Sequence, residues 1–147
     1  MASVAEVCIS EKKGTVKHPV SQIRVQQKVG IPGDAHAGDW HRQISLLASE
    51  SVDKMRRFLP GLAAGSFAEN ILTEGIKLTD LPVGTRLRVG KSLLEITQIG
   101  KECHKDCAIR KQAGDCVMPR EGVFAIVLKD GTIKKGDEIC IDTGAEV

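Results

Sequence analysis

The sequence predicts a mostly β fold, a barrel or a sandwich with one or two short helices, built as a single domain over residues 1–147. Two observations lead to this fold class. Short apolar runs with strand-like patterns follow one another at close spacing, and glycine-rich turns separate them. Only one run has a strong helical pattern. A chain of 147 residues is long enough for one domain with a real core, and no repeat, low-complexity tract or interdomain linker divides it.

The strands follow from local patterns along the chain. Gln22–Gln27 alternates, with Ile23 and Val25 on one face, which is typical of a half-buried strand. Val123–Leu128 is continuously apolar, which suits a strand buried on both faces. A turn is expected at Val89-Gly90-Lys91. The full set of expected strands is Val4–Ser10, Gln22–Gln27, Arg42–Leu47, Phe67–Thr73, Thr85–Val89, Leu93–Gln98, Val123–Leu128 and Glu138–Asp142.

A helix is predicted over Ser49–Leu59. Ser49 is the expected N-cap, and Pro60-Gly61 stops the helix. Acidic residues come early in this run and basic residues late, which suits the helix dipole. The expected buried stripe is Val52, Met55 and Leu59. A second, short helix is expected near Lys105–Gln112.

Composition excludes several classes of protein. A net charge of +2 and an aromatic content of 3% argue against a nucleic-acid-binding surface. No apolar run approaches the roughly 20 residues of a membrane helix. The start of the sequence lacks the pattern of a signal peptide, so we expect a cytoplasmic protein with reduced thiols. Five cysteines, an odd number, also argue against a closed disulfide framework.

Chemistry is expected in the stretch Leu93–Pro119, which carries three of the five cysteines. An apolar run leads to Gly100, and Cys103 follows among Lys101, His104 and Lys105. Cationic neighbours stabilise a thiolate, which is the reactive form of cysteine. Cys103 is therefore the candidate nucleophile or metal ligand.

The other cysteines allow more than one interpretation. Cys107 and Cys116 either take part in the chemistry or only pack, whereas Cys8 and Cys140, in terminal strands, are expected to be structural. A zinc site is a further alternative, but the C-x3-C-x8-C spacing differs from the paired C-x2-C knuckles of structural zinc sites.

The loop Asp34–His41 holds two Asp-x-His pairs and has three interpretations. The pairs could chelate a divalent metal, as in a metal-dependent hydrolase, or could simply serve turns. We favour a third interpretation, in which the loop lines a pocket with His36 as a polar contact and Trp40 as an apolar wall.

Arg42-Gln43 and Glu69-Asn70 are polar pairs inside apolar runs. Because strand side chains alternate, one member of Arg42-Gln43 must face inward. An inward arginine needs an anion, either a carboxylate such as Glu69 or a bound phosphate. No nucleotide-binding glycine motif is present.

These pieces together resemble the MOSC domain, the small β-rich domain named for the C-terminus of molybdenum cofactor sulfurases. The resemblance covers nearly the whole chain and depends on the order and spacing of the pieces. They are Gly30–Asp34 with His36 and Gly38, Arg42–Leu47, Phe67–Ile71, Leu81–Leu87, Leu94–Thr97, Cys103, Gly122–Phe124 and Gly136-Asp137.

The resemblance implies a barrel-like fold and an essential cysteine at Cys103, which would carry a persulfide or ligate molybdenum. It also implies the molybdenum cofactor (molybdopterin) as the bound group. The sequence has no pyridoxal-phosphate desulfurase domain, and it lacks the extra N-terminal β domain of the amidoxime-reducing relatives. It is most similar to the small stand-alone members.

The expected function is therefore that of a molybdenum-cofactor-associated sulfur carrier, with sulfurtransferase-type or molybdenum-dependent activity. Lys101 and His104 would tune Cys103, and Cys107 or Cys116 would resolve a persulfide. An anionic ligand would be held by Arg42, Asn70, His36 and Asp34. The expected partners are a cysteine desulfurase and molybdenum cofactor biosynthesis proteins or molybdoenzymes. The alternative is a non-catalytic module that binds or delivers the cofactor.

Overall fold

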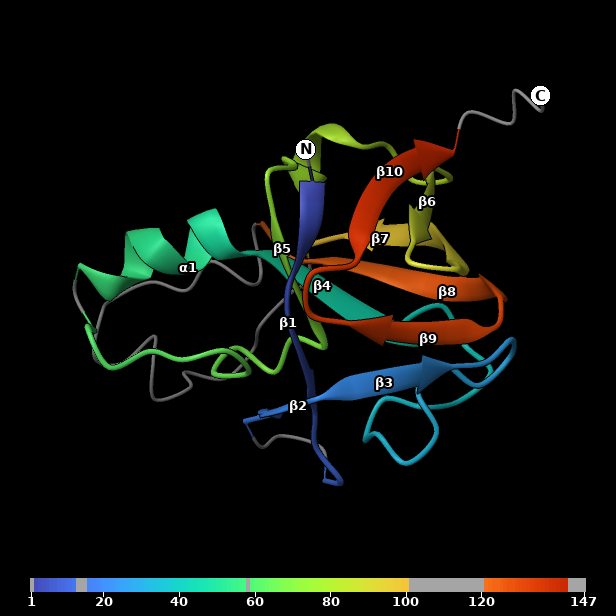
Figure 1. The fold of residues 1–147 in the computed structure, drawn as a ribbon, viewed down its shortest axis with the longest axis horizontal. Coiled ribbons are helices and arrows are strands. Elements are labelled where there is room, and N and C mark those ends of the chain that lie inside the picture. The colour runs from blue at the N-terminus through green and yellow to red at the C-terminus, as the bar shows by residue number, and fades with distance from the viewer. Residues whose placement is uncertain (1, 13–15, 58, 101–120, 143–147) are drawn as a thin grey trace.

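The structure, a computed structural model, describes residues 2–12, 16–57, 59–100 and 121–142. It is mostly β, as predicted, with one α-helix among the described residues (Figure 1). The strands are β1 (Ala2–Ile9), β2 (His18–Val20), β3 (Gln22–Val25), β4 (Ile44–Ala48), β5 (Ile71–Glu74), β6 (Arg86–Val89), β7 (Ser92–Ile99), β8 (Val123–Lys129), β9 (Gly131–Lys134) and β10 (Glu138–Asp142). The helix α1 spans Ser49–Arg56, and a short 3-10 turn spans Leu78–Asp80.

Seven strands close into a barrel in the order β10-β6-β7-β8-β4-β5-β1, and pairing of β1 with β10 completes the circle. Only β4 and β5 in this circle run parallel, which is why the connection between them contains α1. β2 extends the sheet beside β1, and β3 pairs with β9 in a separate two-stranded ribbon. Closure leaves few open strand edges.

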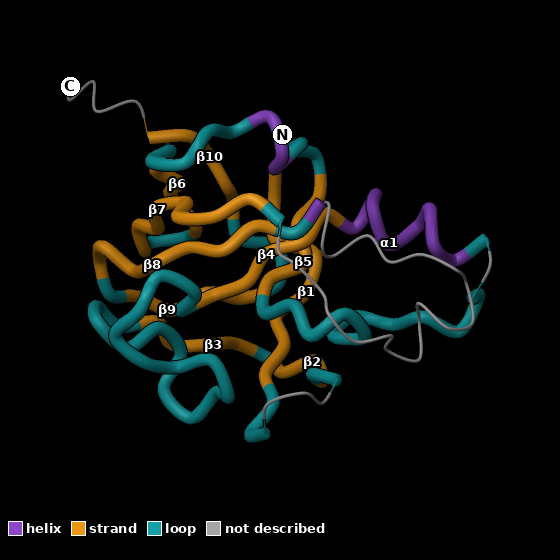
Figure 2. The backbone as a smooth tube through the Cα atoms, turned by 180° about the vertical axis from the view of Figure 1, so that it is seen from behind, coloured by secondary structure: helices purple, strands orange, loops and turns teal. Residues whose placement is uncertain are grey.

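Two apolar clusters fill this architecture. Alternate residues of the barrel strands point inward and are buried there, among them Ile44, Leu87, Leu94 and Ile96. A smaller cluster lies between the barrel wall and α1 and includes Leu47, Val52, Met55, Leu72 and Phe124. The helix therefore packs against the outside of the barrel and extends away from it, as the two opposite views show (Figures 1 and 2).

Most predicted elements are present with bounds that differ by at most three residues, but the N-cap of the helix differs. Ala48, not Ser49, is the N-cap, and no side chain caps the helix. Strand β4 runs directly into α1, so the cap position falls on the last, buried residue of the strand. The helix ends at Arg56, and Leu59 is only partly buried, whereas Val52 and Met55 are buried as predicted.

The predicted strand Phe67–Thr73 is wrong in its first half. The chain turns there, with Ala68 at a φ of 62°, and β5 begins only at Ile71. The turn forms because the Glu69 carboxylate accepts hydrogen bonds from the backbone N–H of Gly65 (2.7 Å) and of Phe67 (3.1 Å). The apolar residues around Glu69 conceal this turn from a pattern-based prediction.

The structure adds two strands to those predicted and places the two terminal-strand cysteines differently. Strands β2 and β9 were not expected, because both are short and carry charged or proline residues. Cys8 is buried, in keeping with a structural role, but Cys140 is exposed and does not pack in the core. The helix expected near Lys105–Gln112 lies outside the described residues. Where the chain is described, no helix is long and apolar enough to cross a membrane.

Candidate functional site

The cysteine segment, residues 101–120, leaves the barrel at the end of β7 and returns at the start of β8. Ile99 pairs with Val123, and the N–H of Gly100 donates to the carbonyl of Gly122 over 2.6 Å. The described residues on either side of the segment, Gly100 and Gly122, thus lie side by side. Lys101, Cys103, His104, Cys107 and Cys116 lie outside the described residues, so the predictions for them stay predictions.

A β-bulge shapes the end of β7. Ile96 is opposite Ala125, but Gln98 is opposite Phe124, so Thr97 is an extra residue in β7. Ile96 and Ala125 point into the barrel, while Phe124 belongs to the outer cluster. Without the bulge, Gln98 would share the inward face of Ile96. The bulge instead turns Gln98 outward at the base of the cysteine segment.

Gln98 joins two basic side chains there. Its Oε1 lies 3.1 Å from Nε of Arg42 and 3.0 Å from Nε2 of His41, and its Nε2 donates to the carbonyl of Gly100 over 2.8 Å. Because an amide oxygen only accepts, His41 carries its proton on Nε2 in this arrangement. We call these three residues, His41, Arg42 and Gln98, the Gln98 cluster.

The guanidinium of Arg42 is held without a carboxylate. It is 5.2 Å from the centre of the Phe124 ring, a cation–π contact, and within the described chain it pairs with no Asp or Glu. Arg42 is partly exposed, and its neighbour Gln43 is the inward member of the pair, accepting the N–H of Val127. Glu69, the carboxylate that the sequence suggests as a partner, instead accepts hydrogen bonds from the backbone N–H groups of Gly65 and Phe67. Arg42 therefore offers an anion its remaining donors.

Asp34 lies in a different place, inside a buried ion pair. Its Oδ1 is 2.9 Å from Nζ of Lys17, and neither side chain is exposed. Burial alone would raise the pKa of Asp34, but hydrogen bonds from Lys17 and from the N–H of Ser10 and His36 outweigh it, so the pKa is lowered. His36 Nδ1 lies 3.9 Å from Oδ2 of the same carboxylate. This pair anchors the loop that leads to the Gln98 cluster.

Asn70 is fully buried and ties three strands together. Its Oδ1 accepts the N–H of Ser45 and the Ser45 hydroxyl, and its Nδ2 donates to the carbonyl of Cys8 over 3.1 Å. A ligand could reach Asn70 only if this clamp opened. Of the four residues expected to hold an anion, Arg42 is the one beside Gln98, and its Nε is the only guanidinium atom with a hydrogen bond to the residues that the structure describes.

The Asp-x-His pairs do not converge. Asp34 is buried against Lys17, while Asp39 and His41 are exposed. Among the residues that the structure describes, no three His, Cys, Asp or Glu side chains form a group that could hold a metal ion. The geometry thus gives no support to a metal-dependent hydrolase on this loop.

The same loop does line a groove, which we call the Trp40 groove. Its volume is ≈ 460 Å³. The lining residues are Gln27, Lys28, Asp39, Trp40, His41, Gln43, Thr97, Ile126, Val127 and Leu128. His41 and Thr97 belong to both the groove and the base of the cysteine segment, so the two features are continuous. The sequence pointed to Trp40 as a pocket wall and to His41 as a possible metal ligand in the same loop. Thr97 and Gln98 were missed as site residues because the bulge has no sequence signal.

The fold is similar to that of several solved structures. The YuaD protein from Bacillus subtilis superposes with a TM-score of 0.79 at 21% identity, covering 95% of this chain and 94% of that one. YiiM from Geobacillus stearothermophilus has a TM-score of 0.72 at 21% identity over 97% of this chain and 75% of that one. YiiM from Escherichia coli gives 0.66 at 17% identity over 97% and 70%.

A family model decides the membership. The model of the MOSC domain matches residues 32–140, which include the Asp34–His41 loop, the Gln98 cluster and the whole cysteine segment. The barrel agrees with the fold expected from the sequence motifs. The chain belongs to the MOSC domain family.

Proposed function

We propose that this protein is a sulfur carrier that works with the molybdenum cofactor, with Cys103 as the thiol that carries a persulfide or ligates molybdenum. The observation that supports the proposal most is the Gln98 cluster at the base of the cysteine segment. Cys103 follows Gly100 by three residues, so chain length limits the distance between their Cα atoms to roughly 11 Å. We therefore propose that the thiol works in the neighbourhood of Arg42.

The sequence around Cys103 supplies the electrostatics. Lys101 and His104 flank it, and positive charge lowers the pKa of a thiol and increases its thiolate fraction. The Arg42 guanidinium, which lacks a carboxylate partner in the described chain, adds a further positive charge near the segment. A persulfide anion on Cys103 is stabilised by the same charges.

The chemistry of sulfur transfer balances without an external oxidant. The Cys103 thiolate attacks the outer sulfur of a persulfide on a donor cysteine, a new S–S bond forms, and the donor leaves as its thiolate. Delivery follows when an acceptor takes the outer sulfur. Alternatively, the thiolate of Cys107 or Cys116 attacks Cys103 sulfur, which leaves a disulfide and releases hydrosulfide. The donor that fits is a cysteine desulfurase.

The residues at the segment base fit an anionic, phosphate-bearing cofactor. Arginine binds phosphate through paired N–H donors, and the donors of Arg42 not used by Gln98 remain available. His41 and Thr97 would border the same ligand from the Trp40 groove. When bound, the molybdenum cofactor supplies a redox-active metal that a thiolate can ligate. We place the protein in the cytoplasm, beside molybdenum cofactor biosynthesis proteins or molybdoenzymes.

The test is to load the purified protein with sulfur from a cysteine desulfurase and free cysteine, then to measure intact mass. Wild type is expected to gain the mass of one sulfur atom. Cys103→Ala is expected to gain none, while its circular dichroism spectrum stays that of the folded wild type. Cys140→Ser, which removes the exposed cysteine of β10, is the matched control and should load as wild type does. Equal loading of Cys103→Ala and wild type would remove Cys103 from the mechanism.

A module that only binds or delivers the cofactor remains the second candidate, because neither Arg42 nor the Trp40 groove depends on a cysteine. In that case Cys103→Ala would bind molybdopterin with unchanged affinity and would keep every activity of the wild type. Titration of both proteins with molybdopterin distinguishes the two functions.

A further inference from the structure

The side-chain amide of Gln98 has one favourable orientation. Its Oε1 faces Nε of Arg42 at 3.1 Å and Nε2 of His41 at 3.0 Å, and its Nε2 faces the carbonyl oxygen of Gly100 at 2.8 Å. Rotating the amide by half a turn would place its NH2 group against the N–H of Arg42 and its oxygen against a carbonyl oxygen. The contacts to Arg42 and Gly100 therefore fix the direction of this amide.

The guanidinium of Arg42 is held from two sides without being neutralised. Its Nε donates to Gln98, and it lies 5.2 Å from the centre of the Phe124 ring. Within the described chain, no Asp or Glu pairs with it. The side chain has thus lost freedom of movement while it keeps its full positive charge. An anion that binds such a guanidinium does not have to order the side chain first.

The site calls for an amide at position 98 rather than a carboxylate. A carboxylate would also accept the N–H groups of Arg42 and His41, and more strongly. It would, however, pair with the charge of Arg42, and it would place an oxygen against the Gly100 carbonyl, which now accepts Nε2 of Gln98. The N–H of Gly100 is already bonded to the carbonyl of Gly122, so both backbone polar groups of this glycine are engaged.

Thr97 holds the neighbouring backbone independently of Gln98. Its hydroxyl lies within hydrogen-bond distance of the carbonyl oxygen of His41, and at 3.2 Å from that of Phe124. The backbone at His41 thus stays attached to the bulge when the side chain of Gln98 changes. A substitution at Gln98 should therefore alter how the Arg42 side chain is held, and much less where the loop lies.

We infer that Gln98 is a positioning residue for Arg42: its neutral amide fixes the guanidinium without cancelling the positive charge. This role rests on the proposed function, in which Arg42 supplies positive charge near Cys103. It adds the residue that controls this charge and the physical reason why that residue is an amide. It holds for any small anion that Arg42 meets, a negatively charged sulfur group included.

Two variants of nearly equal size separate fixing the guanidinium from preserving its charge. Gln98→Glu keeps an oxygen acceptor for Nε of Arg42 but neutralises the charge, whereas Gln98→Met leaves the charge and removes the acceptor. The probe is inorganic sulfate, added to ¹⁵N-labelled protein at constant ionic strength. The side-chain Nε–H of Arg42, assigned by its loss in Arg42→Lys, reports exchange with water. The backbone N–H signals around Arg42 report sulfate binding.

In wild type we expect the Nε–H of Arg42 to exchange slowly and the backbone signals to shift with sulfate. Gln98→Glu should keep the slow exchange but bind sulfate at least about tenfold more weakly, because the new carboxylate pairs with the guanidinium. Gln98→Met should exchange roughly tenfold faster, because the hydrogen bond is gone. It should bind sulfate about two- to tenfold more weakly, because the anion must now order the side chain.

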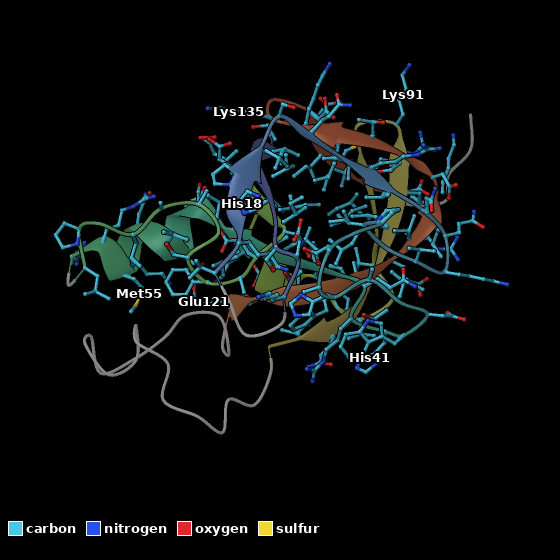
Figure 3. All side chains as sticks on the ribbon, turned by 90° about the horizontal axis from the view of Figure 1, so that it is seen from below. His18, His41, Met55, Lys91, Glu121 and Lys135 are labelled. Carbon is cyan, nitrogen blue, oxygen red and sulfur yellow. The ribbon has the colours of Figure 1, made fainter. Side chains whose placement is uncertain are left out.

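Gln22→Glu is the matched control, because it makes the same change at an exposed glutamine of β3. Gln22 lines a hollow that Lys91 also lines, and Figure 3 shows Lys91 and His41 on opposite sides of the molecule. This variant should bind sulfate as wild type does. A loss as large as that in Gln98→Glu would mean that net charge governs binding, and would overturn the role of Gln98.

A purely structural role makes the opposite prediction for Gln98→Glu, because a variant that keeps Arg42 fixed would also keep sulfate binding. That result overturns the inference, as does a wild type with fast Nε–H exchange or no response to sulfate. If Gln98→Met loses the wild-type backbone spectrum, Gln98→Glu decides alone. The proposed function fails separately: a wild type that shows the expected sulfate binding but never loads sulfur on Cys103 keeps the positioning residue and loses the sulfur carrier.

Discussion

The Nε of Arg42 and the Oε1 of Gln98 are 3.1 Å apart, although 56 positions separate the two residues in the sequence. The contact exists because the bulge at Thr97 turns Gln98 out of the barrel. It links the loop that begins at Gly30 to the strand from which the cysteine segment departs. The side-chain amide of Gln98 thus contacts His41, Arg42 and Gly100, the last described residue before the cysteine segment.

Replacing Arg42 should weaken anion binding. Arg42→Gln removes a guanidinium that has no carboxylate partner in the described chain, and a charged hydrogen bond is worth about 1.5–3 kcal/mol, or roughly ten- to a hundredfold in affinity. Molybdopterin titration would measure the loss. Arg42→Lys keeps the charge but not the paired donors, so its affinity for molybdopterin should lie between those of wild type and Arg42→Gln. Arg24→Gln, at an exposed arginine of β3, should bind as wild type does; an equal loss in both glutamine variants would contradict a specific role for Arg42.

Breaking the Lys17–Asp34 pair should cost stability. Asp34→Asn leaves Lys17 buried without its counter-charge, which typically costs about 3–5 kcal/mol. Urea denaturation at neutral pH would measure the difference. The double variant Lys17→Met/Asp34→Leu, which removes both charges, should recover part of it; a double variant less stable than Asp34→Asn would argue against this explanation.

The same pair predicts a pH dependence. Burial opposes ionisation of Asp34, but the hydrogen bonds from Lys17, Ser10 and His36 prevail and lower its pKa below the ordinary value of 3.8. A lowered pKa contributes stability that is fully present above pH 3.8 and is lost as the pH falls through the folded-state pKa. The stability gap between wild type and Asp34→Asn should therefore be constant from pH 7 to about pH 4 and narrow below it. A gap that instead shrank between pH 7 and 5 would show that another group is responsible.

The two described cysteines should differ sharply in reactivity. Burial, reinforced by the nearby Glu69 and Glu6 carboxylates, raises the pKa of Cys8 to about 12, and its side chain is fully buried. Cys140 is exposed on β10. Iodoacetamide at pH 8 should alkylate Cys140 in the native protein and Cys8 only after denaturation, as peptide mass spectrometry would reveal. Rapid native labelling of Cys8 would mean that β1 opens far more readily than its packing indicates.

Gly65 should tolerate no side chain. An added Cβ would lie 2.0 Å from the carbonyl oxygen of Lys17, and its φ is +90°. Gly84 has a similar φ of +98° but open space around it, so Gly84→Ala carries only the backbone strain, about 1–2 kcal/mol. Gly65→Ala should cost about 1–3 kcal/mol more than this control in urea denaturation. Equal losses in the two variants would mean that the Lys17 segment moves aside without cost.

Local patterns were reliable where one face of an element is buried. The alternation around Ile23 and the stripe of Val52 and Met55 predicted their elements, because burial of one face imposes the period of the structure on the sequence. The pattern was wrong around Glu69, where a buried carboxylate holds a turn within apolar residues. A hydrogen bond between a side chain and the backbone leaves no periodic pattern in the sequence, so a pattern-based prediction cannot detect this turn.

The sequence by itself determined the β class and the family motifs, and it made Cys103 the candidate for the reactive residue, because each depends on residue types and their spacing. Only the tertiary structure decided which polar residues meet. It buried Asp34 against Lys17 and Asn70 against Ser45, and it brought His41 and Arg42 to Gln98 beside the Trp40 groove. These contacts arise from barrel closure and from one extra residue in β7, and neither is encoded by any short stretch of the chain.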